Sequence, residues 1–195
     1  DRQAFLWDVS SGRTIRRFVG HRERINTIRF AANSQLILTG SYDNTLRIWD
    51  VRSSNRKEIE ILKFFRDSVT SIMPIDEDHE FLAASVDGSI RTFDSREGKV
   101  VEDNLNDAVA SIALSNDKNC LAAACLDGSI RLLDRNQGEI LNIYEGHTHK
   151  DFSIDVGFSS RDGEVVCVRK TNICRHLNSS PSRVRKTAMS LYITL

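Results

Sequence analysis

Short apolar runs separated by polar turns dominate the chain, and residues 20–50 show the pattern most clearly. Apolar runs at 25–30, 36–39 and 46–49 are separated by polar segments, with a turn at Asp43-Asn44 before the last run. Short runs rich in β-branched and aromatic residues, bounded by Asn, Asp and Gly, predict strands rather than helices. The stretch therefore predicts three short antiparallel strands, and the run at 58–63 predicts an outer fourth strand.

The same pattern recurs along the chain. One unit has strands at 69–75, 81–86 and 89–94, with an outer strand at 99–101; the next has strands at 109–114, 121–126 and 129–134, with an outer strand at 140–144. Residues 1–8 and 13–19 form the last two strands of an earlier unit, and Gly146-His147 opens a further unit with strands at 152–158 and 164–168. The loops are expected at 76–79, 116–119 and 161–163.

The spacing of the units indicates one repeating object. The closing aspartates Asp8, Asp50, Asp94 and Asp134 are 42, 44 and 40 residues apart. A period of about 40 to 45 residues with a Gly-His to Trp-Asp signature is typical of a propeller blade of four strands. The predicted fold class is therefore all-β, a propeller with about three full four-stranded antiparallel blades and a partial blade at each end.

The first strand of each unit has a helical alternative. Ile25 and Ile28 are three residues apart, as are Val69 and Ile72 in the next unit and Val109 and Ile112 in the one after. This is a helical spacing, but the runs are too short for helices and their apolar residues are β-branched. A β-bulge at the start of the strand also places residues three apart on one face, and we prefer this interpretation.

The turns before the third strands occupy matched positions. Asp43-Asn44, Asp87-Gly88 and Asp127-Gly128 each begin seven residues before a closing aspartate. An Asp-Gly or Asp-Asn pair between apolar strands predicts a hairpin with a type I′ turn, which needs positive φ at both central residues.

Composition and charge fit a globular protein but are unevenly distributed. Hydrophobic residues make up 40% and charged residues 28% of the 195 residues, and the net charge is zero. Six of the 27 Lys and Arg lie in residues 165–195, which contain no acidic residue, so 21 remain in residues 1–164 against all 27 Asp and Glu. The composition therefore changes near residue 165. No apolar run is long enough to span a membrane, and no secretory signal is recognisable.

No motif for catalysis or metal binding emerges, and we expect no enzyme activity, cofactor or metal. The cysteines Cys120, Cys125, Cys167 and Cys174 form no C-x-x-C pair and, even with His147 and His149, match no zinc module. We expect reduced thiols in an intracellular protein. Nucleophile-elbow, P-loop and zincin signatures are absent. Ser180-Pro181 and Asn178-Ser179-Ser180 fit short modification motifs that arise readily by chance.

These motifs resemble the WD-repeat propeller family over about residues 1–168. Strings such as GSYDNTLRIWDVRSSN and RLLDRNQGEILNIYEGHTHKDFSIDVGF resemble, within it, the WD repeat domain-containing protein 83 family of mitogen-activated protein kinase organizers. The resemblance implies a non-catalytic scaffold for protein complexes. It implies kinase-cascade components and spliceosomal proteins as partners, and a cytoplasmic and nuclear location.

The resemblance also implies a buried hydrogen-bonding tetrad in residues 20–50. His21, Thr39, Asp43 and Trp49 match the family's tetrad positions, and a buried network of this kind is favourable only when complete. An Asp/His/Thr set resembles a catalytic triad, but nothing in the sequence indicates an oxyanion hole beside it. The other units retain Asp87 or Asp127 but have Ala83 and Phe93, or Ala123 and Leu133, at the other positions. We therefore expect one complete tetrad, with apolar packing in the other blades.

The candidate partner-binding residues lie around the mouth of the propeller channel. The family's rim positions are the residue before each turn aspartate and the residues beside the first strand. These positions are Tyr42, Val86, Leu126, Arg24, Asn26, Ser68 and Thr70. Tyr and Arg are enriched at binding hot spots, whereas the competing interpretation of each position is a solvated loop residue.

The segment 169–195 departs from the family, since no further turn or Trp-Asp follows Val168. We expect it to be a poorly ordered basic tail, produced by a different exon end or an altered gene model. Its Arg183-Val184-Arg185-Lys186 run leaves open a second hypothesis, contact with RNA or DNA, although direct contact is not our preferred interpretation. Because the sequence starts at Asp1 and the ring is incomplete, we expect an upstream N-terminus and marginal stability of this chain alone.

Overall fold

The computed structural model describes residues 1–31, 34–53, 57–76, 80–145, 154–159 and 165–169. These residues form sixteen β-strands and contain no helix. A two-stranded sheet comes first, with β1 (Gln3–Trp7) and β2 (Thr14–Val19). The second sheet has β3 (Ile25–Phe30), β4 (Leu36–Ser41), β5 (Leu46–Asp50) and β6 (Glu60–Leu62).

The remaining sheets repeat this plan. The third has β7 (Val69–Asp76), β8 (Glu80–Ser85), β9 (Ser89–Asp94) and β10 (Lys99–Asn104). The fourth has β11 (Val109–Leu114), β12 (Cys120–Cys125), β13 (Ile130–Asp134) and β14 (Ile140–Tyr144). The fifth has β15 (Ile154–Phe158) and β16 (Val165–Arg169). Every strand pair is antiparallel and joins strands that are consecutive in the chain.

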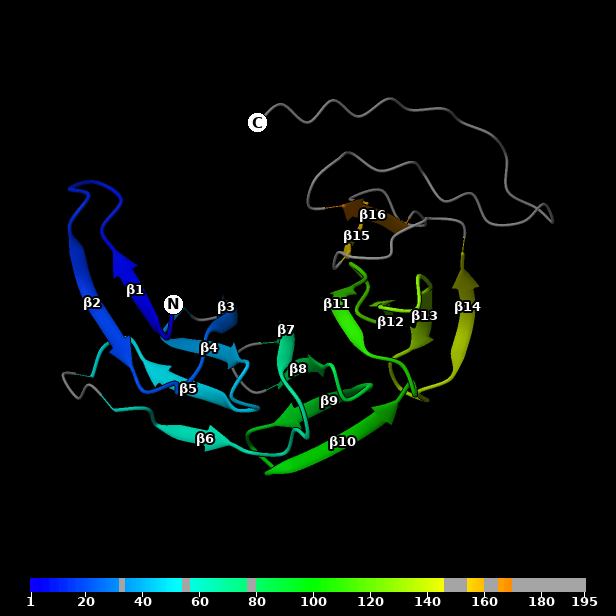
Figure 1. The fold of residues 1–195 in the computed structure, drawn as a ribbon, viewed down its shortest axis with the longest axis horizontal. Coiled ribbons are helices and arrows are strands. Elements are labelled where there is room, and N and C mark those ends of the chain that lie inside the picture. Colours follow the sequence, from blue (N-terminus) through cyan, green and yellow to red (C-terminus); the bar gives the residue numbers. More distant parts are fainter. Residues whose placement is uncertain (32–33, 54–56, 77–79, 146–153, 160–164, 170–195) are drawn as a thin grey trace.

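The sheets follow one another around an open arc (Figure 1). The first strands β3, β7, β11 and β15 lie on the inside, where each contacts the next, and β2, β6, β10 and β14 form the outside. This arrangement confirms the predicted class, an incomplete β-propeller of three full blades flanked by partial ones. The predicted opening at Gly146-His147, the turn at 161–163 and the tail from residue 170 lie outside the described residues.

A β-bulge begins the inner strand of each full blade, as the sequence predicted. The register shifts between Ile25 and Thr27, between Val69 and Ser71, and between Val109 and Ser111. The bulge brings residues three apart onto one face, so Val69 and Ile72 are both fully buried. The helical spacing in the sequence is therefore a property of a bulged strand.

The type of the hairpin turns differs from the prediction. Asn44, Gly88 and Gly128 have positive φ, but Asp43, Asp87 and Asp127 do not, so the turns are not type I′. The Gly88 N–H donates to Ser85 O and the Gly128 N–H to Cys125 O, which closes a turn one residue earlier than expected. Each aspartate uses Oδ1 to accept from the N–H two residues on, at Thr45, Ser89 or Ser129. This side-chain turn sets the aspartate conformation and leaves positive φ to the residue that follows.

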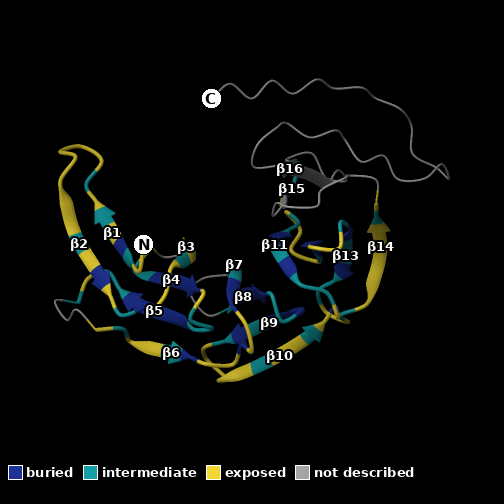
Figure 2. Cartoon of the chain, viewed as in Figure 1, coloured by how far each residue is buried: buried dark blue, intermediate teal, exposed yellow. Residues whose placement is uncertain are grey.

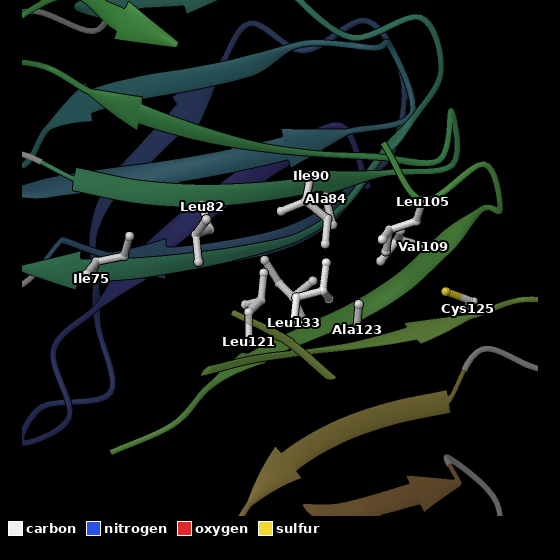
Figure 3. Packing of buried hydrophobic residues seen from close by; sticks show 11 residues of the cluster. Ile75, Leu82, Ala84, Ile90, Leu105, Val109, Leu121, Ala123, Cys125 and Leu133 are labelled. Carbon is white, nitrogen blue, oxygen red and sulfur yellow. The ribbon is translucent and has the colours of Figure 1, made fainter. Parts of the chain in front are cut away.

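The core consists of apolar layers between neighbouring blades rather than one central core. Figure 3 shows Leu82, Ala84 and Ile90 of one blade facing Leu121, Ala123 and Leu133 of the next. Alanines on β8 and β12 are fully buried and let the sheets approach. At Gly40, the position that corresponds to Ala84, a Cβ would lie 2.5 Å from Val69 Cγ1, so the first full blade needs glycine there. Burial is highest in the middle strands and lowest on the outside of the arc (Figure 2).

Candidate functional site

A buried relay of hydrogen bonds links the four predicted tetrad residues of the first full blade. His21 lies in the loop between β2 and β3, Thr39 on β4, Asp43 in the following turn and Trp49 on β5. His21 Nδ1 is 2.9 Å from Asp43 Oδ2, and His21 Nε2 is 2.8 Å from Thr39 Oγ1. The Trp49 Nε1–H donates to the same Thr39 oxygen at 2.8 Å. The structure therefore brings all four side chains together.

The hydrogen-bond directions follow from what each group can donate. The Asp43 carboxylate accepts from His21 Nδ1–H, so the neutral imidazole presents Nε2 as the acceptor for the Thr39 hydroxyl. Burial lowers the pKa of His21 below its ordinary value and outweighs the opposing hydrogen bond to Asp43. Burial acts to raise the pKa of Asp43, but bonds from Thr45, the Arg22 N–H and His21 lower it overall. At neutral pH the relay therefore holds a neutral histidine and an ionised aspartate.

The relay also explains the glycine before His21. A Cβ at Gly20 would lie 2.4 Å from Arg47 Nη1 and 3.0 Å from Trp49 Cη2. The Gly-His pair therefore combines a close backbone approach to the Trp49 ring with the first member of the relay. The Phe18 ring packs against Trp49 from the preceding sheet, at 5.5 Å between centroids.

The next two blades replace the relay with apolar side chains. At the positions of His21, Thr39 and Trp49, one blade has Phe65, Ala83 and Phe93 and the next has Leu105, Ala123 and Leu133, all buried. Phe93 packs against Phe65 at 5.9 Å and stacks on Phe81 at 5.0 Å between centroids. In these two blades alanine replaces the threonine, and no imidazole or indole N–H is present to bond to its hydroxyl. The blades therefore avoid a buried hydroxyl without a partner.

In these two blades, arginines on the third strands form ion pairs with the turn aspartates. Arg91 donates to Asp87 Oδ2 at 3.1 Å, and Arg131 donates to Asp127 Oδ2 at 2.8 Å and also to Asp107. In the first full blade Asp43 is engaged by His21, and the corresponding Arg47 pairs instead with Glu58 at 3.2 Å. Sequence reasoning missed these arginines, although the strings TLRIWD, SIRTFD and SIRLLD carry one at the same place.

The predicted rim residues before the turn aspartates occupy equivalent places. The N–H groups of Tyr42, Val86 and Leu126 each donate to a carbonyl just before the inner strand, from Arg24, Ser68 and Ala108. The Tyr42 ring is 53% exposed, and the Arg24 guanidinium lies over it at 5.3 Å from the ring centroid. Leu126 is also exposed, whereas Val86 is half-buried.

The other predicted rim residues have bonds inside the fold. Asn26 Nδ2 donates to Val69 O at 2.9 Å, and Thr70 Oγ1 donates to Val109 O at 2.7 Å, so each bulge residue ties its blade to the next. Ser68 is only 2% exposed and has no accessible side chain to offer a partner. Asn26 remains exposed despite its bond, whereas Thr70 is half-buried. Tyr42, Arg24, Leu126 and Asn26 therefore present the accessible side chains of the predicted rim set.

The side chains that could hold a metal ion are those of His, Cys, Asp and Glu. Within the described residues, no group of three of these side chains is placed to do so. In the Asp43, His21 and Thr39 set, the Thr39 oxygen accepts the Trp49 Nε1–H. Burial raises the pKa of the thiol of Cys125 to about 11. No helix in the same part of the chain is long and apolar enough to cross a membrane.

The consecutive four-stranded blades give the chain the fold of an incomplete β-propeller, and the His21 relay resembles the tetrad of WD-repeat proteins. The family described as "WD domain, G-beta repeat" matches residues 12–50 and 99–134, which confirms the resemblance to WD-repeat proteins. Among curated proteins, the chain is 30% identical over 128 residues to the WD repeat domain-containing protein 83 homolog of Dictyostelium discoideum. This match covers 52% of the chain. The chain is 32% identical over 104 residues to the guanine nucleotide-binding protein subunit beta of Zea mays, a match that covers 50% of the chain.

A third relative matches a shorter stretch. THO complex subunit 6 of Arabidopsis thaliana is 42% identical over 53 residues, 27% of this chain and 14% of its own length. The chain spans 39% of the Dictyostelium protein and 27% of the maize protein. It therefore corresponds to a minor part of each of these relatives.

Proposed function

We propose that the chain is a non-catalytic scaffold that holds partner proteins at the rim of its propeller. The observation that carries this proposal is the exposed Tyr42 ring, stacked against Arg24 beside the buried relay. An aromatic ring and a guanidinium are the side chains most enriched at binding hot spots. A surface built from turns that are bonded to one another is rigid, which suits assembly rather than turnover.

The relay holds the backbone that presents this pair. Asp43 accepts the Arg22 N–H at 2.9 Å, and Ser41 Oγ donates to Arg24 O at 2.8 Å. The loop that carries Arg24 and the turn that carries Tyr42 are thereby bonded to each other on both sides of the pair. A prearranged pair loses less conformational entropy when a partner binds.

The partner classes come from the resemblance to WD repeat domain-containing protein 83. We propose that they are components of a mitogen-activated protein kinase cascade and, as a second group, spliceosomal proteins. A protein with both groups of partners acts in the cytoplasm and in the nucleus. The match to the Dictyostelium homolog, 30% identical over 128 residues, motivates this choice.

Removing the stacked pair is expected to abolish partner capture without unfolding the chain. Affinity capture from nuclease-treated extract, read by quantitative mass spectrometry, compares the natural chain with Tyr42→Ala/Arg24→Ala. Because each hot-spot side chain contributes about 2 kcal/mol or more, kinase-cascade or spliceosomal proteins should fall at least about tenfold. Phe64→Ala is the matched control, since that ring is equally exposed at 52% but packs beside Phe93 of the next blade.

Three outcomes decide the proposal. Loss of these partners with Tyr42→Ala/Arg24→Ala but not with Phe64→Ala supports it, provided that both variants keep the thermal midpoint of the natural chain. Undiminished capture by the double variant would overturn the rim assignment. Capture that is seen only without nuclease treatment would overturn it as well, because nucleic acid would then be the bridging partner.

A further inference from the structure

The outer strand β14 forms an exposed apolar edge on the fourth sheet. It ends the order β11-β12-β13-β14, so only β13 pairs with it among the described strands. Ile140, Leu141 and Ile143 are 47%, 53% and 49% exposed. Figure 2 shows this strand as a mainly exposed band on the outside of the arc. This surface lies on the outer circumference and shares no residue with the rim.

The other outer strands carry the charges that normally protect a sheet edge. The strand sequences are TIRRFV for β2, EIL for β6 and KVVEDN for β10, whereas the sequence of β14 is ILNIY. Charged residues on an edge strand oppose pairing with a foreign strand, because pairing would bring them out of water. Among these four strands, β14 alone has no charged residue.

The backbone of β14 offers a donor to an incoming strand. The Ile143 N–H donates to the side-chain oxygen of the preceding Asn142, at 2.9 Å. This is a local bond between neighbouring residues on an exposed strand, and the carbonyl of an added strand can replace it. The bulge at Leu141 interrupts the β13–β14 register but leaves the pairing of residues 142–144 intact.

A second copy of this chain is a poor occupant of the edge. Antiparallel self-pairing centred on Asn142 would place Glu139 of one copy opposite Glu145 of the other at both ends. Both glutamates are exposed, and no ion pair with another described residue neutralises either of them. Like charges directly opposite each other destabilise strand pairing.

We propose that the β14 edge binds an extended peptide segment of a partner protein, apolar in its centre and basic at both ends. Main-chain hydrogen bonds to the edge supply affinity, and alternate apolar side chains lie beside Ile140, Leu141 and Ile143. Basic residues six positions apart on the peptide match the spacing of Glu139 and Glu145, which flank the strand. The rim and the edge are then separate contact surfaces on one scaffold.

The test uses a fluorescent peptide, Lys-Val-Thr-Val-Thr-Val-Lys, and its counterpart with Glu at both ends. Fluorescence anisotropy at low salt measures binding to the full chain. The Lys-ended peptide should bind about tenfold more tightly than the Glu-ended one, from two exposed charge pairs. The variant Glu139→Lys/Glu145→Lys should reverse this preference, a result that loss of folding cannot produce.

A second pair of variants tests the role of the backbone. Ile143→Pro removes the edge N–H and should abolish binding, since proline is tolerated on an edge strand but cannot donate. Ile143→Ala removes a similar side chain, keeps the N–H and should weaken binding only a few-fold. No binding of the Lys-ended peptide at about 1 mM, or equal binding by the Pro and Ala variants, would overturn the proposal. So would a dimer, seen by sedimentation, that Ile143→Pro dissociates, because the edge would then pair with a second copy.

Discussion

Replacing Trp49 by alanine is expected to destabilise the chain more than Phe93→Ala or Leu133→Ala, although the three residues occupy the same place in successive blades. Truncation of a buried Trp or Phe costs about 3–5 kcal/mol, and of a Leu about 2–5 kcal/mol. Only Trp49→Ala also removes the indole N–H from the relay at Thr39. Disturbing a buried hydrogen bond adds about 1–3 kcal/mol. Urea unfolding at pH 7.5, where His21 is neutral, measures the three losses.

Trp49→Phe separates the lost hydrogen bond from the lost apolar area. It keeps an aromatic ring at the site, so its remaining deficit reports mainly on the broken relay. We expect this deficit to shrink when Thr39→Ala is already present, because the shared oxygen is then gone. Equal losses of unfolding free energy for the three alanine variants would show that the relay contributes nothing beyond packing.

Asp87→Ala is expected to cost about 3–5 kcal/mol of unfolding free energy, because it leaves a buried guanidinium without its main partner. Arg91 is only 3% exposed and is held between the Asp87 carboxylate and the face of Phe65, 5.0 Å from the ring centroid. Its other carboxylate partner, Glu102, is about half exposed and compensates only in part. Chemical denaturation at neutral pH measures the loss.

The double variant Asp87→Ala/Arg91→Met provides the decisive comparison. Methionine follows the course of the arginine stem without a charge, so the buried cation disappears together with its partner. We expect the double variant to recover more than half of the stability lost in Asp87→Ala. If it is no more stable than Asp87→Ala, the aspartate acts through its turn bonds to Ser89 and the Arg66 N–H rather than through Arg91.

The sequence predicted the blades well because their signals are local and repeated. The bulges could be inferred from pairs such as Val69 and Ile72, since a spacing of three in a short β-branched run fits a bulged strand better than a helix. The fold class followed from the spacing of the closing aspartates. The turn type was wrong because the preference of Asp-Gly for type I′ turns competes with side-chain turns, and here the aspartate carboxylate decides the conformation.

The parts that the sequence did not reveal depend on contacts between blades. Asn26 and Thr70 look like exposed loop residues, yet each donates to a backbone carbonyl of the next blade, which only the ring geometry shows. Arg91 and Arg131 lie on strands, where a charged residue is usually taken to face solvent, but they reach back over four residues to the turn aspartates. The repeat of arginine at one position in three blades was the available signal.

We expect the buried relay of the first full blade to hold the turn and loop that present Tyr42 and Arg24. Hydrogen–deuterium exchange of the natural chain and of Thr39→Ala measures this effect, because that substitution breaks the relay without touching the rim. We predict that the amides of Arg22 and Tyr42 lose protection by at least about tenfold, whereas the corresponding amides of Arg66 and Val86 in the next blade do not change. Unchanged protection of the Arg22 and Tyr42 amides in Thr39→Ala would show that the relay does not hold these backbone segments.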